Sequence, residues 1–357
     1  MVGRLSLRDF RSYSKLDLGL EPGLVLVTGP NGAGKTNLLE SLHVGTQGFS
    51  PRTRVDAQLV RFGRDAARIA LRGERAGIPL DLEVMLEVGT GKRATLNGAR
   101  LRAAEQLRGE VTTLVFTPDR LVIVKGGPAA RRAYFDRALG RLAPSRAGLS
   151  AEYGAAVGQR NAALRRVAQG FSTREALAPW NDQVGRLGAE LVAGRHEAVG
   201  ALQPHFAERA GELGVDGAEL RYDGEPPTVE QLEARVDRDL ERGTTGLGPH
   251  LDDVGVLSRD RDLRAFGSQG EQRLAVLALL LAETELLEER RGTRPLLLLD
   301  DVLSELDPGR RRILADRLRA GGQALVTSAS RNSLPGEPAQ TLEVAQSSEG
   351  TSAVRAA

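Results

Sequence analysis

A glycine-rich segment near the start of the chain has the residue types and the spacing of a phosphate-binding loop. Between the apolar residues 24–28 and a predicted helix, the segment reads Gly29, Pro30, Asn31, Gly32, Ala33, Gly34, Lys35, Thr36. Glycines let backbone N–H groups wrap around phosphate oxygens, and the helix N-terminus adds partial positive charge. The ammonium of Lys35 can reach phosphoryl oxygens, and the hydroxyl of Thr36 can coordinate Mg²⁺. The segment therefore predicts a nucleoside triphosphate site that takes ATP and Mg²⁺.

Two consecutive carboxylates complete this chemistry. Asp300 and Asp301 follow the apolar run 296–299, which has the pattern of a buried parallel strand. Because Mg²⁺ keeps several waters and takes one or two carboxylates, Asp300 is predicted to hold the metal together with Thr36. Asp301 is predicted to orient or deprotonate the attacking water. Lys35 and Asp301 are thus the candidate catalytic residues of an ATPase.

Two predicted helix starts carry further candidates. Ser268 and Glu271 have the spacing of a capping box, and a helix N-terminus with a serine hydroxyl and the Gly270 amide is also an anion site. Asp307 precedes Pro308, which is the pattern of an N-cap followed by proline at the first helical position. The capping explanation is sufficient for each segment taken alone.

The order of these motifs along the chain resembles that of the ATP-binding-cassette ATPases. In that class a Ser-x-Gly-x-Gln signature on one protomer completes the γ-phosphate site of another. The resemblance implies that Ser268, Gly270 and Gln272 act in trans, and that Ser304 and Asp307 belong to the loop that crosses the dimer seam.

Two positions depart from the cassette pattern. Asp301 stands where most of these ATPases have glutamate, and the shorter side chain predicts slow hydrolysis. The predicted strand at 324–330 contains no histidine at the usual switch position, so Thr327 or Ser328 is the candidate for that role. The glutamine that contacts the metal is not identified, because Gln47 lies close to the phosphate loop in sequence.

Length and periodicity predict an α/β protein of about two domains. Residues 1–117 read mostly as strands around a helix at 35–44, and they form the N-terminal part of the ATPase lobe. Residues 118–261 have helical spacing and form a second lobe. Residues 262–357 carry the signature helix, the strand before Asp300 and the C-terminal part of the head, and the tail after Asn332 is predicted to be partly disordered.

Basic residues are concentrated in the helical part. From Arg120 to Trp180 there are eleven lysines and arginines against three acidic residues, while the whole chain is only +2. A segregated basic segment is the pattern expected for contact with nucleic acid. Since aromatic residues make up only 4% of the chain, contacts to the DNA backbone are expected to dominate. The candidate DNA-binding residues are Lys125, Arg131, Arg132, Arg160, Arg165, Arg166.

Sequences spread over some 300 residues resemble the RecF family of bacterial recombination mediators. They include residues 5–13, the phosphate loop with residues 37–41, residues 116–119, 124–132, 248–253 and 300–307. The resemblance implies an ATPase head related to chromosome-cohesion (SMC) proteins but without a long coiled coil, with Arg11 among the ATP-binding residues. It further implies ATP-dependent homodimerisation, binding to double- and single-stranded DNA at gaps, and cooperation with RecR, RecO and RecA.

Composition bears on the cellular compartment and on possible metal sites. The chain has no cysteine, and its longest apolar run is too short for a bilayer crossing, so we expect a cytoplasmic protein without a membrane partner. The four histidines show no metal-ligand spacing, and His250 lies in one of the RecF-like segments. A transporter ATPase, a small-molecule P-loop kinase and a purely structural DNA clip remain open, and nucleotide turnover with and without DNA distinguishes them.

Overall fold

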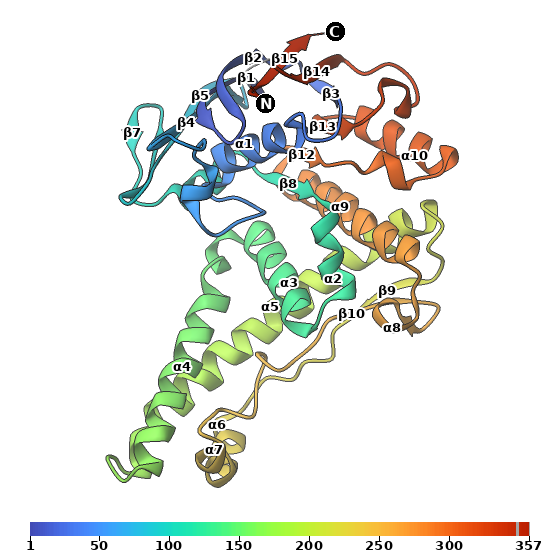
Figure 1. Ribbon diagram of the computed structural model, residues 1–357. Coiled ribbons are helices and arrows are strands. Elements are labelled where there is room, and N and C mark those ends of the chain that lie inside the picture. The colour runs from blue at the N-terminus through green and yellow to red at the C-terminus, as the bar shows by residue number, and fades with distance from the viewer. Residues whose placement is uncertain (348–349, 357) are drawn as a thin grey trace. The chain divides into compact units, whose positions relative to one another are not determined.

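The chain divides into two compact units in the computed structural model, which describes residues 1–347 and 350–356 (Figure 1). Unit 1 comprises Met1–Asp119 and Arg291–Ala357, and unit 2 comprises Arg120–Arg290. The first division lies two residues from the expected boundary at 117. The second follows the signature helix, whereas the sequence placed the boundary before it. This helix falls in unit 2 because its Glu283 binds Tyr134 and Arg141 there.

An antiparallel sheet of six strands, which we call sheet A, forms one layer of unit 1. Its strand order is β2-β1-β4-β5-β6-β7. The strands are β1 Val2–Phe10, β2 Tyr13–Gly19, β4 Ala66–Arg75, β5 Ile78–Glu87, β6 Gly91–Leu96 and β7 Ala99–Arg100. Buried and exposed residues alternate along β4 and β5, as expected for a sheet with one face on the core.

A second six-stranded sheet, sheet B, carries the predicted apolar strands. Its order is β15-β14-β3-β13-β12-β8, and all neighbours are parallel except β14 and β15. The strands are β3 Gly23–Thr28, β8 Thr113–Phe116, β12 Leu296–Leu299, β13 Gln323–Ser328, β14 Gln340–Gln346 and β15 Ser352–Ala356. The prediction of a partly disordered tail is wrong for 340–346 and 352–356, because these residues pair with each other and with β3.

Helix α1, Lys35–Gln47, contributes Leu38, Leu39 and Leu42 to a single core that also takes the inward residues of both sheets. Helix α10, Pro308–Arg319, follows β12. Short 3-10 turns connect the remaining parts of unit 1, at Asp56–Leu59, Ala104–Gly109, Leu303–Glu305 and Arg331–Ser333, and another at Pro118–Leu121 leads into unit 2.

Unit 2 is mainly helical, as predicted. Its helices are α2 Val122–Lys125, α3 Pro128–Leu142, α4 Leu149–Ala168, α5 Ala178–Glu212, α6 Val229–Ala234, α7 Val236–Arg242, α8 Leu263–Phe266 and α9 Gln269–Arg291, with 3-10 turns at Pro144–Arg146 and Arg174–Leu177. A small antiparallel sheet has the order β11-β10-β9, with β9 Ala218–Arg221, β10 Gly255–Ser258 and β11 Arg261–Asp262. Helices α3, α4 and α5 share an apolar core, and α4 packs along α5.

The predicted capping box at Thr228 is present, since its hydroxyl accepts a hydrogen bond from the Gln231 N–H and the Gln231 side chain returns one. None of the helices within the described residues is long and apolar enough to cross a membrane.

Candidate nucleotide site

The phosphate loop connects β3 to α1 in unit 1. Gly29, Gly32 and Gly34 have φ angles of 146°, 80° and 114°, a backbone region that favours glycine. A Cβ atom at Gly29 would lie 2.1 Å from the carbonyl oxygen of Val344, and one at Gly34 would lie 2.3 Å from Oγ of Ser352. Both conformation and space therefore require glycine at positions 29 and 34.

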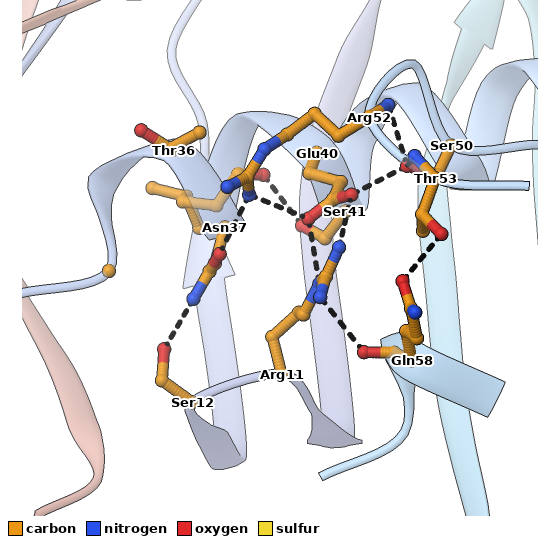
Figure 2. Close-up of polar contacts among 12 residues, drawn as sticks. Arg11, Ser12, Thr36, Asn37, Glu40, Ser41, Ser50, Arg52, Thr53 and Gln58 are labelled. Carbon is orange, nitrogen blue, oxygen red and sulfur yellow. Dashed lines mark hydrogen bonds and ion pairs between the residues drawn. The ribbon is translucent and has the colours of Figure 1, made fainter. Parts of the chain in front are cut away.

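The C-terminal hairpin holds this loop from one side. The hydroxyl of Ser352 donates to the Ala33 carbonyl at 2.5 Å, and its Oγ lies 2.7 Å from Oγ of Ser12. The Asn37 amide also donates to Ser12 Oγ, at 2.9 Å (Figure 2). Sequence reasoning missed these three residues. Nothing in a serine- and glycine-rich tail signals a contact with a loop more than 300 positions away.

Lys35, Thr36 and Asp300 meet at the carboxyl ends of β3 and β12. The Lys35 ammonium donates to the carbonyls of Gly29 at 2.6 Å and Pro30 at 3.0 Å. The Thr36 hydroxyl lies 2.9 and 3.1 Å from the two carboxylate oxygens of Asp300. Burial lowers the pKa of Lys35, while the nearby carboxylates of Asp301 and Asp300 act in the opposite direction.

This donor set fits a magnesium-bound triphosphate. The Lys35 ammonium is buried within the loop, and a hydroxyl and a carboxylate supply the hard oxygen atoms that Mg²⁺ prefers. The arrangement brings together the candidate phosphate-binding and metal-binding residues of unit 1.

Thr327 at the end of β13 connects the two acidic residues. Its buried hydroxyl donates to Oδ1 of Asp300 at 2.7 Å and accepts from the Asp301 N–H at 2.8 Å. Asp301 has a φ angle of 50°, the left-handed region that is costly for a residue with a Cβ atom. Ser328, the other switch candidate, instead bonds to Ser330 and Ser333. Thr327 is therefore positioned to fix the geometry of the acid pair.

Arg11, an expected ATP ligand, is engaged by a buried carboxylate. Its guanidinium donates to both oxygens of Glu40 at 2.9 Å and to the Gln58 carbonyl at 2.9 Å. Figure 2 shows Arg11 and Arg52 converging on Glu40, which also accepts from Ser50 at 2.6 Å. Arg11 is thus brought next to α1, with its donors occupied by protein groups. Its direct contact with ATP stays a prediction.

The expected signature residues lie at the start of α9 in unit 2. Ser268 forms the predicted capping box, since its Oγ accepts from the Glu271 N–H at 3.2 Å and its own N–H donates to the Glu271 carboxylate at 2.9 Å. Ser268 and Gly270 are exposed. The assignment of Gln272 needs correction: it is 5% exposed, and its amide donates to the carbonyls of Leu263 and Gly267. It therefore supports the helix start from inside unit 2.

The loop after the acid pair is arranged as a helix cap. Asp307 accepts from the Arg310 N–H at 3.0 Å and begins α10, and the exposed Ser304 donates to the Asp301 carbonyl at 3.0 Å. The role of Ser304 and Asp307 at a dimer seam stays a prediction. Gln47 is buried and donates to Val111, which gives it a structural role away from the acid pair.

Two of the expected DNA-binding arginines are core residues, so this assignment is corrected. Arg131 is 1% exposed and binds Asp253, and Arg160 is 0% exposed and binds Asp239 at 2.7 Å. A guanidinium enclosed in this way cannot reach a DNA phosphate.

Several other arginines of the basic segment also have acidic partners from elsewhere in unit 2. Arg141, Arg146 and Arg174 bind Glu283, Glu197 and Asp237. Arg132 donates to the Asp252 carbonyl, and Arg165 donates to the Gly243 carbonyl at 3.4 Å. Five cations of the segment thus pair with carboxylates, namely Arg131, Arg141, Arg146, Arg160 and Arg174. Among the candidate DNA-binding residues, Lys125, Arg165 and Arg166 are exposed.

Comparisons with known proteins agree with this geometry. The family model described as RecF/RecN/SMC N terminal domain matches residues 1–353. The DNA replication and repair protein RecF of Symbiobacterium thermophilum is 38% identical over 91% of this chain and 90% of its own length. The RecF protein of Halalkalibacterium halodurans is 33% identical over 98% of both chains.

Solved structures give the same result. The recombination mediator protein RecF-ATP in the RecFOR pathway aligns with a TM-score of 0.88 and 27% identity, covering 99% of this chain and 97% of the other. An Smc head bound to the C-winged helix domain of ScpA aligns over 100% of this chain and 97% of the other, with a TM-score of 0.62 and 17% identity, which supports the head fold alone. The predicted ATPase-head fold is therefore confirmed, and the chain belongs to the RecF family.

Proposed function

We propose that this protein is a DNA-binding ATPase of recombinational repair and replication restart, which binds ATP with Mg²⁺ and hydrolyses it slowly. The single observation that carries the proposal is the convergence of Lys35, Thr36, Asp300 and Asp301 in unit 1, in a chain of the RecF family. Relatives of this family include an ATP complex, which supports ATP as the nucleotide.

Each residue of the site has a role that follows from its position. The loop N–H groups and Lys35 bind the phosphates, and Thr36 and Asp300 would hold the metal. When bound, Mg²⁺ neutralises charge on the phosphoryl oxygens. Asp301 orients the attacking water, and Thr327 holds the carboxylate of Asp300 and the backbone N–H of Asp301.

We infer that the site is completed by a second copy of the chain. Ser268 and Gly270 are exposed at the N-terminus of a 23-residue helix, whose dipole stabilises an anion; the N–H and hydroxyl of Ser268 donate to the Glu271 carboxylate, which the γ-phosphate would replace. Binding of the γ-phosphate by this helix would explain ATP-dependent homodimerisation. Interaction with DNA gaps and with RecO, RecR and RecA is part of the same proposal.

Complementation between two inactive variants tests the shared site. Lys35→Ala removes the phosphate ligand of one protomer, and Ser268→Arg blocks the helix that the partner receives. Each variant alone should lose ATP turnover. Their mixture should regain part of it, because one of the two sites in the mixed dimer has both Lys35 and Ser268. A mixture that stays inactive would show that the site is not shared.

A matched control shows whether the loss of a helix cap by itself reduces ATP turnover. Thr228→Arg changes the capping-box residue of α6 in the same unit and should leave turnover unchanged.

Specific turnover of the unmodified protein should rise with protein concentration and with added duplex DNA. Asp301→Asn should retain ATP binding and lose hydrolysis. Turnover that is flat across dilution and insensitive to DNA contradicts the proposal.

A further inference from the structure

Phe62 is fully exposed on a tightly held turn of unit 1. Its relative exposure is 102%. The turn closes with a hydrogen bond from the Arg64 N–H to the Arg61 carbonyl at 3.0 Å, and Gly63 has a φ of 76°. Asp9 binds Arg61 at 2.8 Å and lies 3.6 Å from Arg64. These two contacts fix the turn, and the ring that it carries buries no apolar surface in the isolated protein.

A row of cations crosses the outer face of sheet A, and its central residue, Arg8, precedes Asp9, which binds both arginines of this turn. The strand register places Arg8 directly opposite Lys15 on β2 and directly opposite Arg68 on β4. Like charges in such cross-strand pairs destabilise a sheet. Arg68 has a partner in Glu83, whereas Arg8 and Lys15 make no ion pair with any residue that the structure describes. At a strand spacing of about 4.8 Å, the three cations lie within roughly 10 Å.

We propose that Phe62 stacks on an unpaired base of DNA while Arg8, Lys15 and Arg68 hold the adjacent phosphates. The proposal rests on DNA binding by this protein and names the surface that recognises the unpaired region. We call the four residues the Phe62 surface.

A nucleic acid explains both features of the surface, whereas an apolar protein partner explains only the ring. Arg8 and Lys15, which pair with no carboxylate of the described residues, match a phosphate backbone, which carries about one charge per 1.7 Å of duplex axis. Stacking of a base on an aromatic ring requires a base that is not already paired and stacked, as in a gap or at its edge. The Phe62 surface therefore distinguishes gapped or single-stranded DNA from blunt duplex.

Binding of labelled oligothymidylate, gapped duplex and blunt duplex to the full chain with ATP and Mg²⁺ tests the proposal. Phe62→Ala should weaken binding to the first two by roughly tenfold or more, and binding to blunt duplex much less. Arg8→Gln should weaken all three and reduce the salt slope for duplex by about 0.9. Phe171→Ala is the matched control, because it removes another exposed ring, in unit 2, and should change no affinity.

A second readout uses Phe62→Trp, whose fluorescence should be quenched by oligothymidylate. If Phe62→Ala binds all three DNAs as the unmodified protein does, the proposal is overturned. It is equally overturned if Phe62→Ala changes only the sedimentation of the ATP-bound protein, since the ring then contacts a second copy. Failure of the unmodified protein to bind any DNA refutes the proposed function itself.

Discussion

Thr327 offers the sharpest test of how the acid pair is held. Thr327→Val keeps the shape of the side chain but removes the hydroxyl that bridges Asp300 and Asp301. The loss of a hydrogen bond to a carboxylate costs about 1.5–3 kcal/mol, and an unsatisfied N–H at Asp301 costs about 1–3 kcal/mol. We therefore expect the free energy of unfolding to fall by about 3 kcal/mol.

The effect on catalysis should appear mainly in kcat. If misplacement of the acid pair costs about 2–3 kcal/mol in the transition state, kcat falls roughly 30- to 160-fold. KM should change much less, because Lys35 and the loop amides bind the ground state as before. Steady-state ATP turnover and urea unfolding of the same preparations measure both quantities.

Thr327→Ser is the matched control for this experiment. It retains the hydroxyl and loses one methyl group, so stability should fall by about 1 kcal/mol while kcat stays near that of the unmodified protein. The reasoning is refuted if Thr327→Val turns over ATP within threefold of Thr327→Ser, a limit set well below the expected effect of roughly 30-fold or more.

The remaining predictions concern stability and loop support. Arg160→Ala leaves a buried carboxylate without its partner and should cost about 3–5 kcal/mol in urea unfolding, whereas the exposed Arg166→Ala should stay within about 0.5 kcal/mol. Burial lowers the pKa of His250, so the unfolded chain binds more protons, and stability should fall as pH drops below about 6.5; His250→Gln should remove this part of the pH profile. Ser352→Ala should weaken ATP binding several-fold, by about 1 kcal/mol, and Ser347→Ala on the same hairpin should not, as measured by nucleotide titration.

Local patterns predicted the parts of the fold that depend on nearby residues. The phosphate loop, the capping box at Ser268 and the N-cap at Asp307 all lie within segments of about eight residues, and each was found as expected. The apolar runs 296–299 and 324–327 predicted two parallel strands, and the structure has them at Leu296–Leu299 and Gln323–Ser328. In each case the physical cause, a hydrogen bond to the next turn or burial on both faces, is contained in the segment.

Local patterns did not reveal contacts between residues that are far apart in the sequence. Arg160 was read as a DNA ligand because its neighbours in sequence are basic, yet its partner Asp239 is 79 positions away. Ser352 contacts Ala33 across 319 positions, in a tail whose composition favoured disorder. Net charge along a segment does not reveal which charges face solvent, since tertiary contacts decide that. The Phe62 surface was missed for the related reason that register, which sets Arg8 opposite Lys15, is not a local property.

Backbone strain gives a further argument for the functional importance of the acid pair and of the Phe62 surface in unit 1. Among non-glycine residues with positive φ in the described chain, those in short hairpin turns, which favour this conformation, are Arg11, Ala76, Asn97, Arg259 and Asp260. Asp301 has no such explanation, because it follows a parallel strand.

Asp9 is the second unexplained case, since it lies within β1, and it holds the turn that carries Phe62. A left-handed residue with a Cβ atom costs about 1–2 kcal/mol, and such strain collects at functional sites. Asparagine adopts this conformation more readily than most residues and lacks the charge. Asp301→Asn therefore removes the carboxylate at the acid pair without adding strain, so a loss of hydrolysis in that variant reports on the carboxylate and not on the backbone.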